Sequence, residues 1–157
     1  CATSPPASEG GFETYGYDPE KSKQLLKEAG FLLIVITNQA GIAKDLYTEE
    51  LVYGIHSKMQ EASENALDDI YFSPYHPDLS GKSLSRKPDS LMIEKAIAKY
   101  NIDPEKSWMV GDRNRDIEAG RKVALQTIQI VSGDEVSIGD YAAANLLEAA
   151  RIILSVS

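Results

Sequence analysis

Three polar stretches of this sequence carry the residue types that could bind and transfer a phosphoryl group. They are Thr37 with Asn38, Arg86 with Lys87, and Asp112 with Asp116. The first pair offers a hydroxyl and an amide, and the second offers two cations that can hold an anion. Paired carboxylates suit Mg²⁺, which prefers oxygen ligands. If the fold brings the three stretches together, they form a site for phosphoryl chemistry.

The acidic stretch reads M-V-G-D-R-N-R-D at residues 109–116. The apolar run at 107–110 predicts a buried strand, and the helical spacing of apolar residues after the stretch predicts a helix. Asp112 and Asp116 therefore follow the carboxyl end of a strand, where ligands bind in open α/β sheets. Two acidic groups there would repel each other unless a cation lies near them. The alternative is that Asp112 starts the helix and Asp116 lies on its solvated first turn.

The other two stretches also follow predicted strands. Residues 31–36, F-L-L-I-V-I, predict a strand that is buried on both faces and ends at Thr37 and Asn38. The basic pair comes after a short predicted strand at 69–72 and a long polar loop. A structural alternative stays open for both pairs. The first could be a polar turn with local hydrogen bonds, and the second a solvated pair at the end of a loop.

The whole chain alternates predicted strands with predicted helices. Strands are expected at 31–36, 69–72, 107–110, 125–131 and 141–144. Helices are expected from Asp18 to Ala29, with Gly30 ending the helix, after the capping residue Thr48 to Ala62, and at 88–100, 116–123 and 146–154. In the second helix, Leu51, Ile55, Met59 and Ala62 are expected on the inner face, with His56 half-buried beside them.

This alternation predicts an α/β fold, a three-layer sandwich with a mainly parallel sheet. No large insertion follows Thr37, so we expect no large cap domain. Residues 1–11 are rich in Pro, Gly and small polar residues and predict a linker or loop. Residues 12–157 are expected to form a single domain.

Composition narrows the class of protein. Of 157 residues, 43% are hydrophobic, which is ordinary for a globular domain, and the net charge of -8 argues against nucleic acid and anionic membranes as partners. The single cysteine, Cys1, excludes an internal disulfide and a cysteine metal cage. Apolar runs are too short for a membrane span, and no signal peptide is visible, so we expect a cytoplasmic protein. The oligomeric state cannot be predicted.

Three motifs, in order, resemble the haloacid dehalogenase (HAD)-like phosphatases. They are V-I-T-N-Q-A-G-I-A-K at 35–44, R-K-P at 86–88 and M-V-G-D-R-N-R-D at 109–116. The resemblance is closest to the branch of D-glycero-D-manno-heptose bisphosphate phosphatase and histidinol phosphatase, and it spans residues 12–153. It implies a Rossmann-like, HAD-type sheet, Mg²⁺ as cofactor and a small phosphorylated metabolite as substrate, with a sugar phosphate such as heptose bisphosphate as the first choice.

The resemblance also implies a role for each motif residue. Thr37 would hold the transferring phosphoryl oxygens, and Asn38, nearby, would bind substrate. Lys87 would balance charge between phosphate and nucleophile. Arg86 would contact substrate, and Arg113 stands where this branch often has a substrate-binding lysine. Asp112 would bind Mg²⁺, with Asp116 supporting or sharing that metal site.

Two features of the sequence depart from the family pattern. The nucleophile motif, a strand ending in Asp-x-Asp-Gly, should precede residues 11–17, yet residues 1–16 contain no aspartate. We therefore expect the first strand and its nucleophile to be absent from this chain. The branch also often carries a structural zinc on a C-x-H and C-x-C pattern. Here those positions look like Ser73, Tyr75, Ser83 and Ser85, so no zinc is expected.

Two functions are therefore open at the level of sequence. The first is a Mg²⁺-dependent phosphatase that works through an aspartyl-phosphate, with the nucleophile supplied by the missing motif. The second is a catalytically inactive relative that keeps the phosphate pocket as a binding module for a phosphorylated ligand or a protein. A receiver domain of the response-regulator type is a weak third option, because receivers carry an acidic pair at the first strand.

Overall fold

The computed structural model describes residues 19–157, and the expectations for residues 1–11 and for Asp18 lie outside the described residues. The helices are α1 (Pro19–Glu28), α2 (Glu49–Ala62), α3 (Pro77–Ser80), α4 (Leu91–Tyr100), the 3-10 helix η1 (Pro104–Lys106), α5 (Asn114–Lys122) and α6 (Leu146–Val156). The strands are β1 (Ile34–Asn38), β2 (Asp69–Ser73), β3 (Trp108–Gly111), β4 (Gln126–Ile130) and β5 (Tyr141–Ala143).

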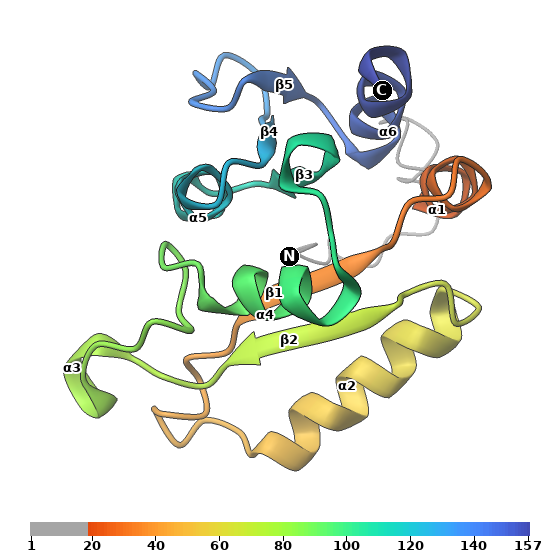
Figure 1. Cartoon of the computed structure of the whole chain (residues 1–157). Coiled ribbons are helices and arrows are strands. Elements are labelled where there is room, and N and C mark those ends of the chain that lie inside the picture. The colour runs from red at the N-terminus through yellow and green to blue at the C-terminus, as the bar shows by residue number, and fades with distance from the viewer. Residues whose placement is uncertain (1–18) are drawn as a thin grey trace.

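The strands form two parallel sheets (Figure 1). In one sheet β1 pairs with β2 so that Asn38 lies opposite Ser73. In the other the order is β3-β4-β5, and Gly111 lies opposite Gln129. All three pairings are parallel, and in β1–β2 and β3–β4 the connection holds a helix, as the alternation of strands and helices predicted. The single sheet expected from the sequence is thus found in two pieces.

Helices cover both faces of the β3-β4-β5 sheet, which confirms the predicted three-layer α/β sandwich. On one face Ile128 and Ala143 pack against Ala149 and Ile153 of α6, and α1 lies beside α6 (Figure 1). On the other face Met109 packs against α4 and α5. Ile36 of β1 packs against this second cluster, so the apolar core joins the two sheets through side chains.

The first described strand lies further along the chain than its apolar run predicted. β1 begins at Ile34, because Phe31 N donates to Leu26 O and so belongs to the turn that closes α1. Gly30 has φ +84, a left-handed conformation typical of the residue that ends a helix, as expected. The strand therefore includes Thr37 and Asn38, and its apolar residues are half-buried, not fully buried.

The inner face predicted for α2 is wrong. Thr48 caps the helix as expected, since its side chain accepts a hydrogen bond from Leu51 N. However, Leu51, Ile55 and Met59 are exposed, and Val52 and His56 are buried instead. The buried face is thus rotated by about one residue position around the helix, which corresponds to about 100°.

His56 is a buried histidine, not the half-buried one that was expected. Its ring lies edge-on to Phe72, with the ring centres 5.5 Å apart, and its Nε2 has no hydrogen-bond partner. Burial lowers the pKa of His56 from its usual value of 6.5. The unfolded chain therefore binds a proton more readily than the folded chain in the range just below that value.

We expect a stability contribution from neutral His56 that is complete above pH 6.5 and is lost as the pH falls below it. His56→Phe keeps an aromatic ring against Phe72 and should flatten this dependence. The measurement is the free energy of unfolding in urea at about pH 7.5 and about pH 5.5. The matched control is His76→Asn, since His76 is the only other histidine. An unchanged slope in His56→Phe would contradict the prediction.

Among residues 19–157, no helix combines the length and the apolar character that crossing a bilayer requires.

Candidate active site

A buried ion pair lies where the carboxyl ends of β1 and β3 come together. Lys87 Nζ is 2.7 Å from Asp116 Oδ1, and both side chains are about 95% buried, with 4% and 5% exposed. Lys87 Nζ also donates to Ile36 O of β1 at 2.6 Å. One ammonium group thus connects a β1 carbonyl to the first turn of α5. Lys87 and Asp116, which were predicted to share a site, do so.

The strand-to-helix turn holds Asp116 in place. The second carboxylate oxygen, Oδ2, accepts a hydrogen bond from Arg113 N at 3.1 Å, and Arg113 is the residue that caps α5. A Cβ on Gly111 would collide with the Asp116 side chain, so glycine is needed there for room. The alternative that Asp112 starts the helix and Asp116 is solvated is therefore wrong, because α5 is capped by Arg113 and Asp116 is buried.

Asn38 fixes the backbone that carries Lys87. Its Nδ2 donates to Lys87 O at 3.1 Å, and its Oδ1 accepts from Lys87 N at 3.0 Å. Both ends of the amide are thus used by one residue on a distant loop. Asn38 was predicted to bind substrate, and these contacts indicate that it positions the lysine.

We expect Asn38→Asp to weaken this clamp, because a carboxylate cannot donate to Lys87 O and would lie against that carbonyl oxygen. The free energy of unfolding should fall by about 1–3 kcal/mol, the usual effect of leaving a buried polar group unpaired. Urea denaturation at neutral pH measures it. Asn65→Asp is the matched control in the turn after α2. Equal stability of Asn38→Asp and the parent chain would mean that the clamp contributes little.

Thr37 is buried and lies in a network that orders the loop after β1. Gln39 Nε2 donates to Thr37 Oγ1 at 3.4 Å, and Tyr47 OH donates to Gln39 Oε1 at 2.8 Å. A Cβ on Gly41 would collide with the Tyr47 ring, so the loop closes on itself at that glycine. Gln39 and Tyr47 were not predicted from the sequence as members of this network, although their amide and hydroxyl groups are of the kinds that form such hydrogen bonds.

Asp112 is half-buried and pairs with one arginine, while two other arginines lie near each other. Arg113 Nε is 3.3 Å from Asp112 Oδ2, and the Arg113 side chain is 63% exposed. Arg86 donates from Nη1 to Tyr75 O at 3.0 Å, which ties it to the loop before α3. Burial, and then the positive charge of Arg115, lower the pKa of Arg86, so Arg115 also lies near this site. Arg115 was not singled out from the sequence.

Few side chains of the described residues could act as ligands to a metal ion. Within residues 19–157 no group of three or more His, Cys, Asp or Glu side chains could hold a metal ion. Both carboxylate oxygens of Asp116 already have partners, Lys87 Nζ and Arg113 N. Asp112 pairs with the exposed side chain of Arg113. Mg²⁺ commonly takes one or two carboxylates and completes its shell with water and substrate phosphate. The residues present therefore fit Mg²⁺ through Asp112, with Asp116 behind it.

Serine hydroxyls meet where the resemblance suggested a zinc pattern. Ser85 Oγ lies 3.1 Å from Ser73 Oγ and 2.9 Å from Ser83 Oγ. Tyr75 is not part of this network, and His76 Nδ1 instead caps α3 by accepting from Asp78 N. The three hydroxyls thus hold the loop closed by hydrogen bonds, and neutral hydroxyls are not the ligands that structural zinc takes.

Strands β1 and β3 are edge strands of their sheets, and each has one edge on which no described strand pairs. Gln39 N donates to Ser73 O, so the backbone groups of Ile36 and Asn38 point away from β2. Likewise Gln126 N donates to Ser107 O, so those of Trp108 and Val110 point away from β4. Among the described residues no strand pairs with these outward edges of β1 and β3.

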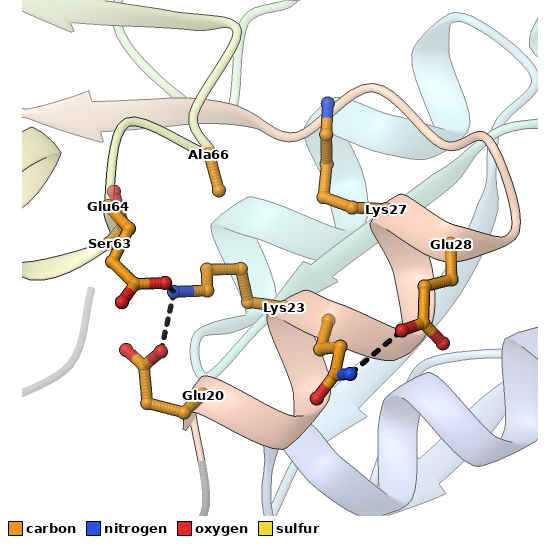
Figure 2. Close-up of a pocket in the computed structure, with 8 residues that line it drawn as sticks. Glu20, Lys23, Lys27, Glu28, Ser63, Glu64 and Ala66 are labelled. Carbon is orange, nitrogen blue, oxygen red and sulfur yellow. Dashed lines mark hydrogen bonds and ion pairs between the residues drawn. The ribbon is translucent and has the colours of Figure 1, made fainter.

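The pocket in Figure 2 lies elsewhere, between α1 and the turn after α2. Its volume is about 470 Å³, and it is near the amino ends of β1 and β2, opposite the ion pair. Its charged side chains already have partners, and Lys27 pairs with Asp68 outside the pocket, with Nζ 2.9 Å from Oδ2. Lys23 lies 2.5 Å from Glu20 and 3.3 Å from Glu64, and Gln24 bonds to Glu28 (Figure 2). The pocket therefore offers no group for phosphoryl chemistry.

The comparisons with known proteins agree on one family. The model of the family described as HAD-hydrolase-like matches residues 84–150. A D-glycero-beta-D-manno-heptose-1,7-bisphosphate 7-phosphatase from Haemophilus influenzae is 33% identical over 141 residues, covering 82% of this chain and 77% of the relative. The protein of the same name from Yersinia pestis is 35% identical over 142 residues, covering 82% and 76%.

Solved structures of proteins with such names have the same fold. The D,D-heptose 1,7-bisphosphate phosphatase from B. bronchiseptica, crystallised with magnesium and phosphate, superposes with a TM-score of 0.76 and 25% identity, covering 89% of this chain and 84% of that one. The enzyme of that name from Burkholderia thailandensis has a TM-score of 0.62 at 23% identity, covering 88% and 86%.

Proposed function

This chain belongs to the HAD-like hydrolases, in the branch of the D-glycero-D-manno-heptose-1,7-bisphosphate 7-phosphatases, and on that premise we propose that it is part of a Mg²⁺-dependent phosphatase of a small sugar phosphate. Heptose bisphosphate is the first candidate substrate, because the relatives are named for it. The compartment we propose is the cytoplasm, where such metabolites are handled.

The observation that carries the proposal is the buried Lys87–Asp116 pair beside Asp112 and Thr37. Burial strengthens the field of the ammonium group, since less water screens it. A phosphate that enters beside it would meet a positive charge fixed by Asp116 and by the carbonyl of Ile36. In this proposal Lys87 stabilises charge on the phosphoryl group, and Thr37 donates a hydrogen bond to one of its oxygens.

The basic side chains at the rim support a substrate with more than one phosphate. We assign the contact with the remote phosphate to Arg86 and Arg113, with Arg115 adding positive charge. A guanidinium can hold a phosphate through two parallel hydrogen bonds. The Arg113–Asp112 pair is largely solvated, so it can open at little cost when an anion arrives.

Asp112 is the residue that would hold Mg²⁺, and Asp116 would support it from behind. When bound, the metal supplies a positive charge that draws electrons from the phosphoryl oxygens. We expect the protein groups around the buried Lys87–Asp116 pair to orient the substrate and to exclude water. The ammonium group, the arginines at the rim and a bound Mg²⁺ would together offset the negative charges of the two carboxylates and of a phosphate monoester.

The nucleophile is not among the 157 residues in its family form, since no Asp-x-Asp-Gly occurs in the sequence. We propose that a carboxylate on a further strand attacks phosphorus, that the bond from phosphorus to the sugar oxygen breaks, and that this oxygen takes up a proton. Water then hydrolyses the acyl phosphate. The outward edges of β1 and β3 support such a strand, because among the described residues no strand pairs with them, although Ile36 O already accepts from Lys87 Nζ.

The alternative is a catalytically inactive relative that binds a phosphorylated ligand or a protein. The absence of the nucleophile motif from the sequence favours it. The test is phosphate release from heptose 1,7-bisphosphate and a panel of other sugar phosphates, with and without Mg²⁺, by this chain together with the strand that carries the proposed nucleophile. Turnover that needs Mg²⁺ supports the enzyme. If this folded protein binds heptose bisphosphate without releasing phosphate, the enzyme is overturned in favour of the binding module.

A further inference from the structure

Two side-chain amides connect the interior of the β3-β4-β5 sheet to the first turn of α5. Gln129 of β4 is buried, with an exposed fraction of 5%, and both ends of its amide have partners. Its Oε1 accepts a hydrogen bond from Ile138 N at 2.7 Å, and its Nε2 donates to Asn114 Oδ1 at 3.0 Å. Asn114 is the first residue of α5 and is exposed. A buried glutamine thus holds an exposed asparagine.

The direction of these hydrogen bonds is fixed by the chemistry of the groups. The backbone N–H of Ile138 can only donate, so the amide oxygen of Gln129 faces it and the amide nitrogen of Gln129 faces Asn114. That nitrogen also can only donate, so Asn114 turns its oxygen toward Gln129. No hydrogen bond within residues 19–157 uses the other end of the Asn114 amide, Nδ2. Asn114 therefore offers a donor whose orientation is set from the interior of the protein.

Asn114 lies beside the site for phosphoryl chemistry. It follows Asp112 by two residues, so the two Cα atoms are at most about 7 Å apart. Lys87 contacts β1 through Ile36 O, whereas Asn114 contacts β4 through Gln129. The two residues thus lie toward opposite sides of β3, the strand that precedes Asp112. A ligand with its phosphoryl group beside Asp112 and Lys87 reaches Asn114 when its remaining atoms extend over β4.

The charges on the β4 side favour a neutral part of the ligand. The loop at 131–140 follows β4 and carries Asp134 and Glu135, which are both exposed. Its hydrogen bond to Gln129 attaches this loop close to Asn114. The two carboxylates would repel a second phosphate there, whereas a sugar hydroxyl has no charge and its oxygen accepts a hydrogen bond from an amide.

The arginines on either side of Asn114 in the sequence contact other groups. Arg113 Nε is 3.3 Å from Asp112 Oδ2, and Arg115 lies near Arg86. Asn114 is therefore the residue of this turn that is tied to β4, and it differs from its two neighbours in being neutral.

We propose that Asn114 is a substrate-binding residue that donates a hydrogen bond from Nδ2 to a hydroxyl oxygen of the sugar, and that Gln129 is the positioning residue that fixes its orientation. This inference rests on the proposed function, since it adds a contact to the same site. The contact makes the site select a sugar phosphate over phosphate alone. Because the amide is neutral, the selection depends little on salt.

The test compares the affinities of three probes for the 157-residue chain by calorimetric titration in the presence of Mg²⁺. The probes are inorganic phosphate, heptose 1,7-bisphosphate, and heptose 7-phosphate, which lacks the remote phosphate. In Asn114→Ala both sugar phosphates should bind about three- to tenfold more weakly, the effect of one lost hydrogen bond, while inorganic phosphate binds as it does to the parent. Gln24→Ala, which removes an exposed amide on α1, is the matched control and should leave all three affinities unchanged.

A second variant tests the positioning role with Asn114 unchanged. Gln129→Met keeps a similar volume and removes both hydrogen bonds, so the Asn114 amide is no longer held. The ratio of sugar-phosphate affinity to inorganic-phosphate affinity should fall by about twofold or more, because binding must then order the side chain. A role of Gln129 in stability alone would lower Tm and leave this ratio as it is in the parent.

Three results would overturn the inference. One is an unchanged affinity ratio in Asn114→Ala, a variant that alters an exposed side chain and is expected to fold. Another is weaker binding of the bisphosphate alone, because Asn114 would then contact the remote phosphate. The third is an unchanged ratio in Gln129→Met, which would remove the positioning role. A parent chain that binds none of the three probes would contradict the proposed function itself, so the two failures are distinguishable.

Discussion

Lys87→Met is expected to lower the free energy of unfolding by about 3–5 kcal/mol, the usual result of removing one partner from a buried ion pair. Methionine fills a similar volume, so little of the loss comes from a cavity. The cause is that Asp116 keeps its charge in a buried position, with Arg113 N as its remaining partner. Ile36 O also loses the hydrogen bond that it accepts from Lys87. Urea denaturation measures the change.

A double variant tests whether the loss of stability in Lys87→Met comes from the broken ion pair or from a general disruption of packing. In Lys87→Met/Asp116→Asn both charges are gone, and the amide oxygen of asparagine can still accept from Arg113 N. We expect this variant to recover at least half of the loss, because a neutral pair of similar shape replaces the ion pair. Lys82→Met, at an exposed position, is the control and should change stability by less than about 0.5 kcal/mol. A loss below about 1 kcal/mol in Lys87→Met would contradict the prediction.

The order of elements could be predicted because each depends on local pattern. The Thr48 cap, the Gly30 helix end and the strand-to-helix turn before α5 all follow from residues close in sequence. The parallel pairing of β1 with β2 and of β3 with β4 then follows from the helix in each connection. The parallel pairing of β4 with β5 does not, because the loop at 131–140 joins them without a helix. The resemblance added which three strand ends meet, and the structure brings Asn38, Lys87 and Asp116 together.

The faces of α2 could not be predicted in this way. Leu51, Ile55 and Met59 form a better apolar stripe than Val52, His56 and Gln60, so helical spacing alone favours the wrong side. Which side is buried is decided by the sheet, where Phe72 lies against His56. A tertiary contact therefore outweighs the local pattern.

The detailed roles in the site also depend on contacts between distant residues. The sequence suggests that Asn38 contacts substrate, yet its amide is used by the backbone of Lys87, 49 residues away. This contact has no signature in sequence spacing, because it depends on how β1 lies relative to the loop that carries Lys87.

In the protein that includes the strand with the proposed nucleophile, Asp112→Asn is expected to reduce phosphate release by about 100-fold or more. In the 157-residue chain it is expected to weaken Mg²⁺ binding, with little change in stability. The amide keeps the shape of the side chain and removes the charge that a hard cation prefers. A metal contributes several kcal/mol to charge stabilisation in the transition state, and each 1.4 kcal/mol is about tenfold in rate. Asp112 is half-buried with a solvated partner, so its replacement leaves no buried charge unpaired.

Calorimetric titration with Mg²⁺ gives a readout that does not depend on turnover. In Asp112→Asn the binding heat should disappear at Mg²⁺ concentrations that saturate the parent chain. Asp134→Asn, at an exposed loop position, is the matched control and should bind as the parent does. If Asp112→Asn binds Mg²⁺ normally while Asp116→Asn does not, the metal ligand is Asp116. The lysine would then have to give up its partner when the metal binds, and the buried pair would be the state of the site without Mg²⁺.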